Sequence, residues 1–358
     1  MVKKTEILRI NSSNFNESIR KAAEILKNGR TVAFPTETVY GLGANALEPD
    51  SVYKIFRAKG RPPDNPLIVH IASKEQVMEL SENIPDDAFV LMDAFWPGPL
   101  TLILKRKKIV PDVTTGGLDT VAIRMPGNRI ALELIKEAGI PIAAPSANIS
   151  GKPSPTTADH VISDLYDKID AVVDGGPVDI GIESTVVDMT SEKPLILRPG
   201  GVGIEDLKIY MPELEIGYSK EKMVGKKVKS PGMKYIHYSP SAKVVLVEGF
   251  NGISDTINQI ISDYRKKGLK VGLLATNDTA DYITEKGLDT FLLGNRDDIK
   301  KIASNVFRGL RTLDDSDLDI IIVDGSIEYD GVGSAVINRL QKAANEIIIL
   351  EKGENIET

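Results

Sequence analysis

The chain has 358 residues, which is natural for two domains and long for one hydrophobic core. With 42% hydrophobic and 27% charged residues it has the composition of a soluble globular protein, which excludes a disordered chain. The lack of cysteine excludes disulfides, a thiolate nucleophile and a cysteine-based zinc site. The net charge of -7 argues against tight general binding to nucleic acid.

Three histidines, far apart in the sequence, argue against a histidine-based metal site, and we predict no metal site built from protein ligands. No apolar run approaches the ~20 residues that a membrane helix needs. The first residues lack the apolar core of a signal peptide. We therefore expect a cytoplasmic protein that makes no contact with a membrane.

Residues 1–215 predict a mixed α/β domain with a twisted sheet. Apolar residues at helical spacing indicate helices at 15–28, 51–58 and 129–138. Short apolar runs indicate strands at 31–34, 66–71, 100–104, 120–124, 171–174 and 184–188.

Residues 216–240 are rich in lysine, lose apolar periodicity and contain Pro231 and Gly232, so we interpret them as a linker. Composition alone favours a solvated tether there.

Residues 241–358 predict a smaller, second domain. Expected strands are 243–247, 271–275, 290–293, 319–323 and 347–350, and expected helices are 254–267, 278–286, 299–310 and 334–345. Strands that alternate with helices through short loops indicate a parallel, doubly wound, Rossmann-like sheet.

The densest chemical signal is the segment 35–43, Pro-Thr-Glu-Thr-Val-Tyr-Gly-Leu-Gly, which follows a strand. We interpret it as one loop that carries hydroxyls and a carboxylate, with glycines that allow backbone to approach a ligand. A tight turn without a ligand is the alternative.

A second signal is the rigid segment 59–67, in which Lys59 and Arg61 are framed by glycine and proline. A point charge and a bidentate guanidinium suit a polyphosphate, whereas a solvated turn is the plainer interpretation. His70 follows, and its position fits a strand-end structural histidine equally well.

The third signal is Ser146-Ala147-Asn148, which follows the apolar run 140–144. Small polar residues after a strand's carboxyl end mark ligand sites in α/β sheets, although helix capping explains them too. Polar residues also interrupt or end apolar strands at Thr120, Arg124, Ser184 and Arg198. An arginine in a buried strand needs an anion or an acidic partner, and a structural pair is the alternative to a ligand.

Together these segments resemble the YrdC/YwlC family of threonylcarbamoyl-AMP synthases. The resemblance rests on Lys59-x-Arg61, Ser146-x-Asn148 and the loop from Pro35 to Leu42. The linker segment 230–240 and the closing Asn338-Arg339-Leu340 are similar to the long form of that family, with Ile236 where the family usually has arginine.

The resemblance implies a YrdC-like first domain that condenses L-threonine, bicarbonate or CO2 and ATP to threonylcarbamoyl-AMP and pyrophosphate, for modification of tRNA next to the anticodon. It implies catalytic roles for Lys59 and Arg61, and Mg²⁺ that accompanies ATP or pyrophosphate. The residues that it assigns to ATP are Lys59, Arg61, Asn65, Thr120, Ser146, Asn148, Ser154, Arg198 and His237. The residues that it assigns to threonine are Thr38, His70, Arg124, Ala144 and Ser184.

The implied partner is a threonylcarbamoyl transferase complex that receives the intermediate, with weak or indirect contact to tRNA. Two other functions remain open on sequence grounds: an RNA-binding module, and a carbamoyltransferase that uses carbamoyl phosphate. The acidic charge and the single tryptophan weaken the first. The lack of a recognisable acylphosphatase-like or zinc-finger segment weakens the second.

Overall fold

The computed structural model describes residues 4–218 and 238–350. These residues form two compact units, one of residues 4–150 and 154–218 and the other of residues 151–153 and 238–350. The domain limits at 215 and 241 stay predictions, and most of the expected linker lies outside the described residues.

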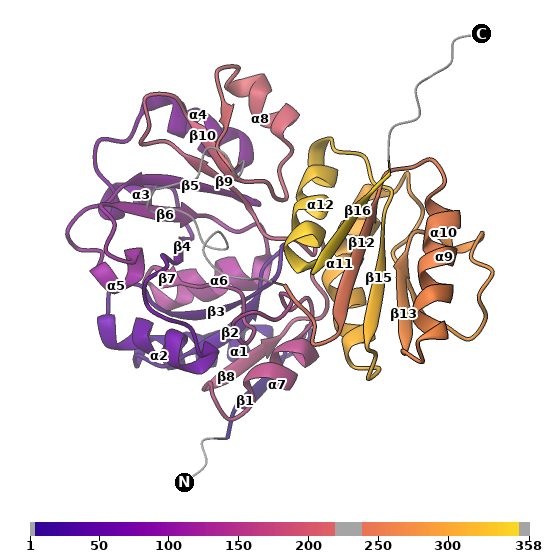
Figure 1. The fold of residues 1–358 in the computed structure, drawn as a ribbon. Helices are drawn as coiled ribbons and strands as arrows, with labels where there is room; N and C mark the ends of the chain where they lie inside the picture. The colour runs from indigo at the N-terminus through magenta and orange to yellow at the C-terminus, as the bar shows by residue number, and fades with distance from the viewer. Residues whose placement is uncertain (1–3, 219–237, 351–358) are drawn as a thin grey trace. The chain divides into compact units, whose positions relative to one another are not determined.

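The first unit is a mixed α/β fold (Figure 1). Its strands are β1 Glu6–Arg9, β2 Val32–Pro35, β3 Tyr40–Asn45, β4 Ile68–His70, β5 Leu100–Lys105, β6 Thr120–Arg124, β7 Ile142–Ala143, β8 Ala171–Asp174, β9 Thr185–Asp188, β10 Leu195–Arg198 and β11 Glu215–Ile216. Its helices are α1 Phe15–Lys27, α2 Pro49–Lys59, α3 Glu75–Leu80, α4 Asp86–Phe95, α5 Asp112–Thr115, α6 Arg129–Ala138, α7 Ala158–Leu165 and α8 Ile204–Tyr210.

The eleven strands form one sheet in the order β1-β8-β2-β3-β7-β4-β6-β5-β9-β10-β11, with parallel and antiparallel neighbours. One face packs against α2, α3, α4, α5, α7 and α8 in the largest core cluster. On the other face, α1 and α6 cover the part of the sheet around β1, β8, β2 and β7. The mixed α/β domain predicted from the sequence is confirmed.

The rest of that second face, formed by β4, β6, β5, β9 and β10, has among the described residues no helix residues in its apolar cluster. Ile68, Ala122, Ile103, Val186 and Leu197 form a small apolar cluster whose members all come from strands. Because side chains two residues apart in a strand share a face, His70 lies beside Ile68, and Thr120 and Arg124 lie on either side of Ala122. The part of the sheet without helix residues in its cluster therefore carries several of the predicted site residues.

The interpretation of residues 35–43 as one loop is wrong in its second half, because β3 begins at Tyr40 and pairs antiparallel with β2. Tyr40 and Leu42 alternate into the core. A Cβ atom on Gly43 would lie 2.7 Å from both Phe34 and Ile142, so this glycine permits close packing of strands. The alternation of Tyr40, Leu42 and Ala44 with glycine in the sequence was the signal for a strand.

The second unit has strands β12 Lys243–Glu248, β13 Val271–Ala275, β14 Asp289–Leu292, β15 Ile320–Gly325 and β16 Glu346–Ile349. Its helices are α9 Ile253–Lys266, α10 Asn277–Ala280, α11 Ile299–Asp314 and α12 Gly331–Ala343. All neighbours in the sheet, whose order is β14-β13-β15-β12-β16, are parallel. Helices α9 and α10 lie on one side of it and α11 and α12 on the other, which confirms the doubly wound, Rossmann-like fold (Figure 1).

The helix expected at residues 278–286 is wrong beyond its first turn, since α10 ends at Ala280. The carbonyl oxygen of Tyr282 accepts a hydrogen bond from the Asn258 side chain, and that of Lys286 accepts one from Arg265. Side chains of α9 thus bind carbonyl groups that a longer helix would have used internally.

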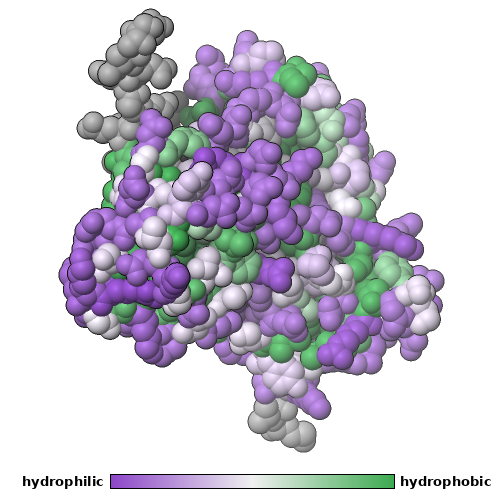
Figure 2. All heavy atoms as spheres, turned by 90° about the vertical axis from the view of Figure 1, so that its right-hand side faces the viewer, coloured by the Kyte–Doolittle hydropathy of each residue, from purple (hydrophilic) through white to green (hydrophobic). Residues whose placement is uncertain are grey.

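Among the described residues, no helix is both long and apolar enough to span a membrane. The face drawn in Figure 2 is mainly hydrophilic, with hydrophobic residues in small, separate areas.

Candidate functional site

Arg124, the last residue of β6, is buried in the first unit. Its Nη1 donates to Thr38 Oγ1 at 2.9 Å and its Nε to the carbonyl oxygen of Gly98 at 3.2 Å. Its Nη2 lies 2.7 Å from Oε1 of Glu37, which is also buried. The acidic partner that a strand arginine needs is therefore Glu37, in the turn between β2 and β3.

His70 ends β4, which runs parallel to β6 with His70 beside Arg124. Burial, and to a smaller degree the Arg124 charge, lowers the pKa of His70 to about 3. Its Nδ1 lies 3.2 Å from the carbonyl oxygen of Ile68, and its ring meets Phe34 edge-on. The imidazole is thus neutral at physiological pH and offers hydrogen bonding without charge.

Ser184 precedes β9, which pairs in parallel with β5. Its hydroxyl lies 2.7 Å from Thr101 Oγ1, and β5 is the neighbour of β6. Ala144 follows β7, and its amide donates to the carbonyl oxygen of Ile68. The residues assigned to threonine thus lie on neighbouring strands or the turns that join them.

Lys59 is the last residue of α2 and is 3% exposed. Gly60 ends the helix in the left-handed conformation, with φ of 62°. The Lys59 ammonium donates to the carbonyl oxygens of Ser146 at 2.5 Å and Asn148 at 2.6 Å. Lys59 therefore ties the end of α2 to the loop after β7, and its contact with phosphate stays a prediction.

The loop that carries Ser146 and Asn148 is itself fixed by β3. Ser146 forms an isolated bridge with Gly41, and the amide of Ala147 donates to the carbonyl oxygen of Tyr40. The Ser146 hydroxyl donates to Asn148 Oδ1 at 2.6 Å. Two of the sequence signals, segments 35–43 and 146–148, are therefore brought together by main-chain pairing.

Asn65 is fully buried beside Arg61, whose Nη2 donates to the Asn65 carbonyl oxygen at 3.4 Å. Among the residues that the structure describes, neither Oδ1 nor Nδ2 of Asn65 has a hydrogen-bond partner. A buried amide left in this state costs about 1–3 kcal/mol per group. The observation points to a ligand that supplies both a donor and an acceptor.

Arg198 is the last residue of β10 and contacts Ser184, which precedes the neighbouring strand β9. Its Nε and Nη2 donate to the carbonyl oxygen of Ser184 at 3.1 and 2.9 Å, and Nη2 also contacts the Ser184 hydroxyl at 3.1 Å. The Ser154 hydroxyl donates to Glu183 Oε1 at 2.6 Å. Arg198, which the resemblance assigns to ATP, and Ser184, which it assigns to threonine, are thus in direct contact.

Two other residues that the resemblance assigns to ATP are Thr120 and His237. Thr120 is buried at the start of β6 and lies on the same face of the sheet as Arg124, at the other end of that strand. His237 lies outside the described residues. Sequence reasoning gave no role to Glu37 and did not single out Thr101 or Glu183; the polar Thr101 within the apolar run of β5 was the available signal for one of them.

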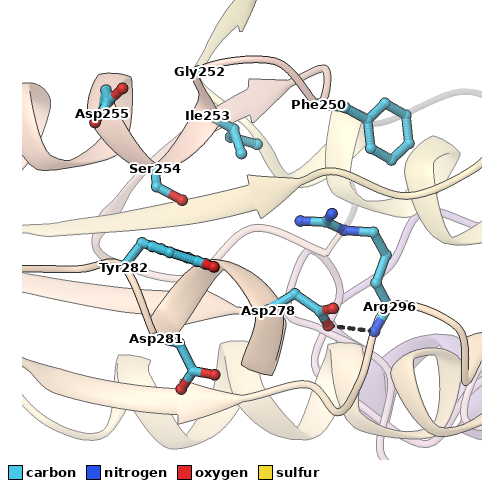
Figure 3. Close-up of a pocket in the computed structure, with 9 residues that line it drawn as sticks. All are labelled: Phe250, Gly252, Ile253, Ser254, Asp255, Asp278, Asp281, Tyr282 and Arg296. Atoms are coloured by element: carbon cyan, nitrogen blue, oxygen red, sulfur yellow. Dashed lines mark hydrogen bonds between the residues drawn. The ribbon is translucent and has the colours of Figure 1, made fainter.

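The second unit contains a separate cavity of about 540 Å³ at the carboxyl ends of β12, β13 and β14 (Figure 3). Three carboxylates, Asp255, Asp278 and Asp281, line it with one guanidinium, Arg296. The backbone amide of Arg296 donates to Asp278, whose pKa it holds below the usual range. This excess of negative charge disfavours the phosphates of ATP there.

Comparison with known proteins places both halves of the chain. A Sua5/YciO/YrdC family model, described as telomere recombination, matches residues 24–200. A second model, described as the C-terminal domain of threonylcarbamoyl-AMP synthase, matches residues 202–345.

Curated relatives extend over nearly the whole chain. A threonylcarbamoyl-AMP synthase of Pyrococcus abyssi is 50% identical, covering 92% of this chain and 95% of the relative. One of Bacillus subtilis is 45% identical, covering 94% and 96%. The crystal structure of P. abyssi Sua5 complexed with L-threonine matches with a TM-score of 0.90 and 46% identity, covering 97% of this chain and 99% of that one.

Proposed function

Because this chain belongs to the threonylcarbamoyl-AMP synthase family, we propose that it condenses L-threonine, bicarbonate or CO2 and ATP to threonylcarbamoyl-AMP and pyrophosphate. The observation that carries this proposal is the buried group around Arg124. It sets a guanidinium among a carboxylate, a hydroxyl and a neutral imidazole, on a sheet face next to Ser184 and Arg198.

On the amino-acid side, the Arg124 guanidinium receives the α-carboxylate, since a planar fork of donors matches it. Thr38, His70 and Ser184 supply neutral polar groups for the rest of the amino acid, and Ala144 supplies a small apolar wall. The proposal is supported by their placement on adjoining strands and turns. It is consistent with the L-threonine of the P. abyssi Sua5 complex.

On the nucleotide side, we assign Lys59 and Arg61 to the phosphates. The buried Asn65 amide, which lacks partners among the described residues, supports the assignment of this loop to ligand binding. The other residues that we assign to ATP are Asn65, Thr120, Ser146, Asn148, Ser154 and Arg198. The assignment of His237 concerns a residue outside the described part of the chain.

We propose the following chemistry for this arrangement. The threonine ammonium first releases a proton, and the free amine adds to CO2 to give a carbamate with loss of a second proton. The carbamate oxygen then attacks the α-phosphorus of ATP while pyrophosphate leaves. No covalent intermediate on the protein is needed, so the residues act by positioning and by stabilising charge. Mg²⁺ enters with ATP as part of the substrate and is held mainly by phosphate oxygens and water.

We further propose that the product passes to a threonylcarbamoyl transferase complex for tRNA modification in the cytoplasm, and that contact with tRNA is weak or indirect. The net charge of -7 supports the last point.

Two variants test the division of the site. Arg124→Lys keeps the charge and loses the fork, so we expect KM for threonine to rise by about tenfold or more with little change for ATP. Asn65→Leu removes the amide that binds no described residue, so we expect KM for ATP to rise by about tenfold or more while thermal stability holds or increases. Steady-state kinetics with each substrate varied separately measures both effects. Equal loss for both substrates in either variant would contradict the proposed division.

A further inference from the structure

Glu37 is a buried carboxylate in the turn between β2 and β3, with 8% of its surface exposed. Its Oε1 lies 2.7 Å from Arg124 Nη2. Within the described part of the chain, however, neither carboxylate oxygen accepts a well-aligned hydrogen bond. Buried carboxylates normally accept several, so the two oxygens of Glu37 have capacity for a donor that the protein itself does not supply.

Among the described residues, Glu37 has one cationic partner. Arg124 is the positive partner on one side, and the nearby His70 is neutral because burial lowers its pKa to about 3. Another wall is backbone: an ideal Cβ atom on Gly127 would be 3.6 Å from Glu37 Oε1. An ammonium group brings three donors and a charge that an ionised carboxylate binds strongly.

The Arg124 guanidinium has the complementary capacity. Nε and Nη1 are used by Gly98 and Thr38, while Nη2 faces Glu37 without a well-aligned acceptor. A free anion would bind beside Glu37 only against repulsion from its carboxylate. An α-amino acid carries a carboxylate and an ammonium on the same carbon, so it can satisfy the guanidinium and the carboxylate together.

We infer that Glu37 binds the α-ammonium group of the amino-acid substrate while Arg124 binds the α-carboxylate. This inference rests on the proposed function and extends it to a residue that reads the substrate's positive charge. The pair thereby selects the zwitterion against carboxylic acids that lack the amine, and it positions the nitrogen that becomes carbamoylated once the ammonium has released a proton.

A role limited to holding Arg124 in place would also make Glu37 important, so the test must separate the two. The probes are L-threonine, 3-hydroxybutyrate, which lacks the ammonium, and L-threoninamide, which lacks the carboxylate. Binding of each to the full chain is measured by calorimetry for the wild type, Glu37→Gln and Glu37→Asp.

For the wild type we expect threonine to bind roughly 10–150-fold more tightly than 3-hydroxybutyrate, the range of one charge-assisted contact. In Glu37→Gln, threonine should weaken by a similar factor, while 3-hydroxybutyrate binds as before or more tightly because the repelling charge is gone. The preference for threonine over threoninamide should persist, and Glu37→Asp should recover part of the preference for the amine.

A parallel loss of affinity for threonine and 3-hydroxybutyrate in Glu37→Gln would show that Glu37 acts only through Arg124 and would overturn the inference. Equal affinity of the wild type for these two ligands would overturn it without any variant. If threonine binds with the expected preference but no threonylcarbamoyl-AMP forms, the proposed function fails and the ammonium site stands.

Discussion

Lys59→Met removes an ammonium group that joins the end of α2 to the loop carrying Ser146 and Asn148. The side chain is 3% exposed, and its two short hydrogen bonds, 2.5 and 2.6 Å, end on main-chain carbonyl oxygens. Each hydrogen bond to a charged group contributes about 1.5–3 kcal/mol. Because methionine keeps the apolar stem, the variant should lose about 3–6 kcal/mol of the free energy of unfolding.

For a unit of this size, 1 kcal/mol corresponds to about 2–4 °C in Tm, so a loss of about 3–6 kcal/mol lowers Tm by roughly 6–24 °C. The chain's one tryptophan, Trp96, is buried in the first unit, and its fluorescence reports the unfolding of that unit. Two controls lie on the same helix. Lys54→Met loses one bond, to the carbonyl oxygen of Gly29, from a half-buried side chain; such a bond contributes about 1–1.5 kcal/mol, so Tm should fall by roughly 2–6 °C. Arg57→Met changes an exposed residue and should leave Tm nearly unchanged. If Lys59→Met and Arg57→Met have the same Tm, the Lys59 ammonium does not hold the loop and the reasoning is refuted.

Two further predictions concern stability. The pKa of His70 is about 3 in the folded protein, below its ordinary value of 6.5, so the unfolded chain binds the extra proton and stability falls as pH drops from 6.5 toward 3. Between pH 7 and 5 the wild type should lose about 2 kcal/mol more than His70→Gln in urea titrations, and equal losses would contradict the buried neutral imidazole. In Gly200→Ala the new Cβ atom would lie 2.3–2.4 Å from backbone atoms of residues 183–185, so the segment that carries Ser184 must shift. We expect a loss of about 1–3 kcal/mol and of threonine affinity, whereas Gly127→Ala, with nearest atoms at 3.6 Å, should retain stability; similar melting of the two variants would argue against this packing.

Elements with a local apolar pattern, either a helical spacing or a short continuous run, were predictable from sequence. Helix 129–138 and strands 120–124, 171–174 and 271–275 match the structure residue for residue. Segment 35–43 was misread because its glycines suggested a loop, while Gly43 in fact allows Phe34 and Ile142 to pack closely. Segment 281–286 was misread because its carbonyl groups bind side chains of α9, a contact that local periodicity does not encode.

The sequence allowed us to predict which residues belong to the site, but not which side chains they contact. Polar residues at strand ends marked Arg124 and Ser184, but only the sheet order brings Glu37 and Thr101 to them. Likewise, the spacing of Lys59 and Arg61 suggested phosphate binding, and nothing in the sequence indicated that the Lys59 ammonium contacts the carbonyl oxygens of a loop almost ninety residues away.

The central claim is that one site joins threonine, inorganic carbon and ATP. The most direct test supplies ¹³C-bicarbonate, L-threonine and MgATP to the purified chain and quantifies pyrophosphate and labelled threonylcarbamoyl-AMP together. We predict equal amounts of the two products, each dependent on threonine and on bicarbonate. Pyrophosphate released at the same rate without threonine, or an adenylate that lacks the label, would contradict the account.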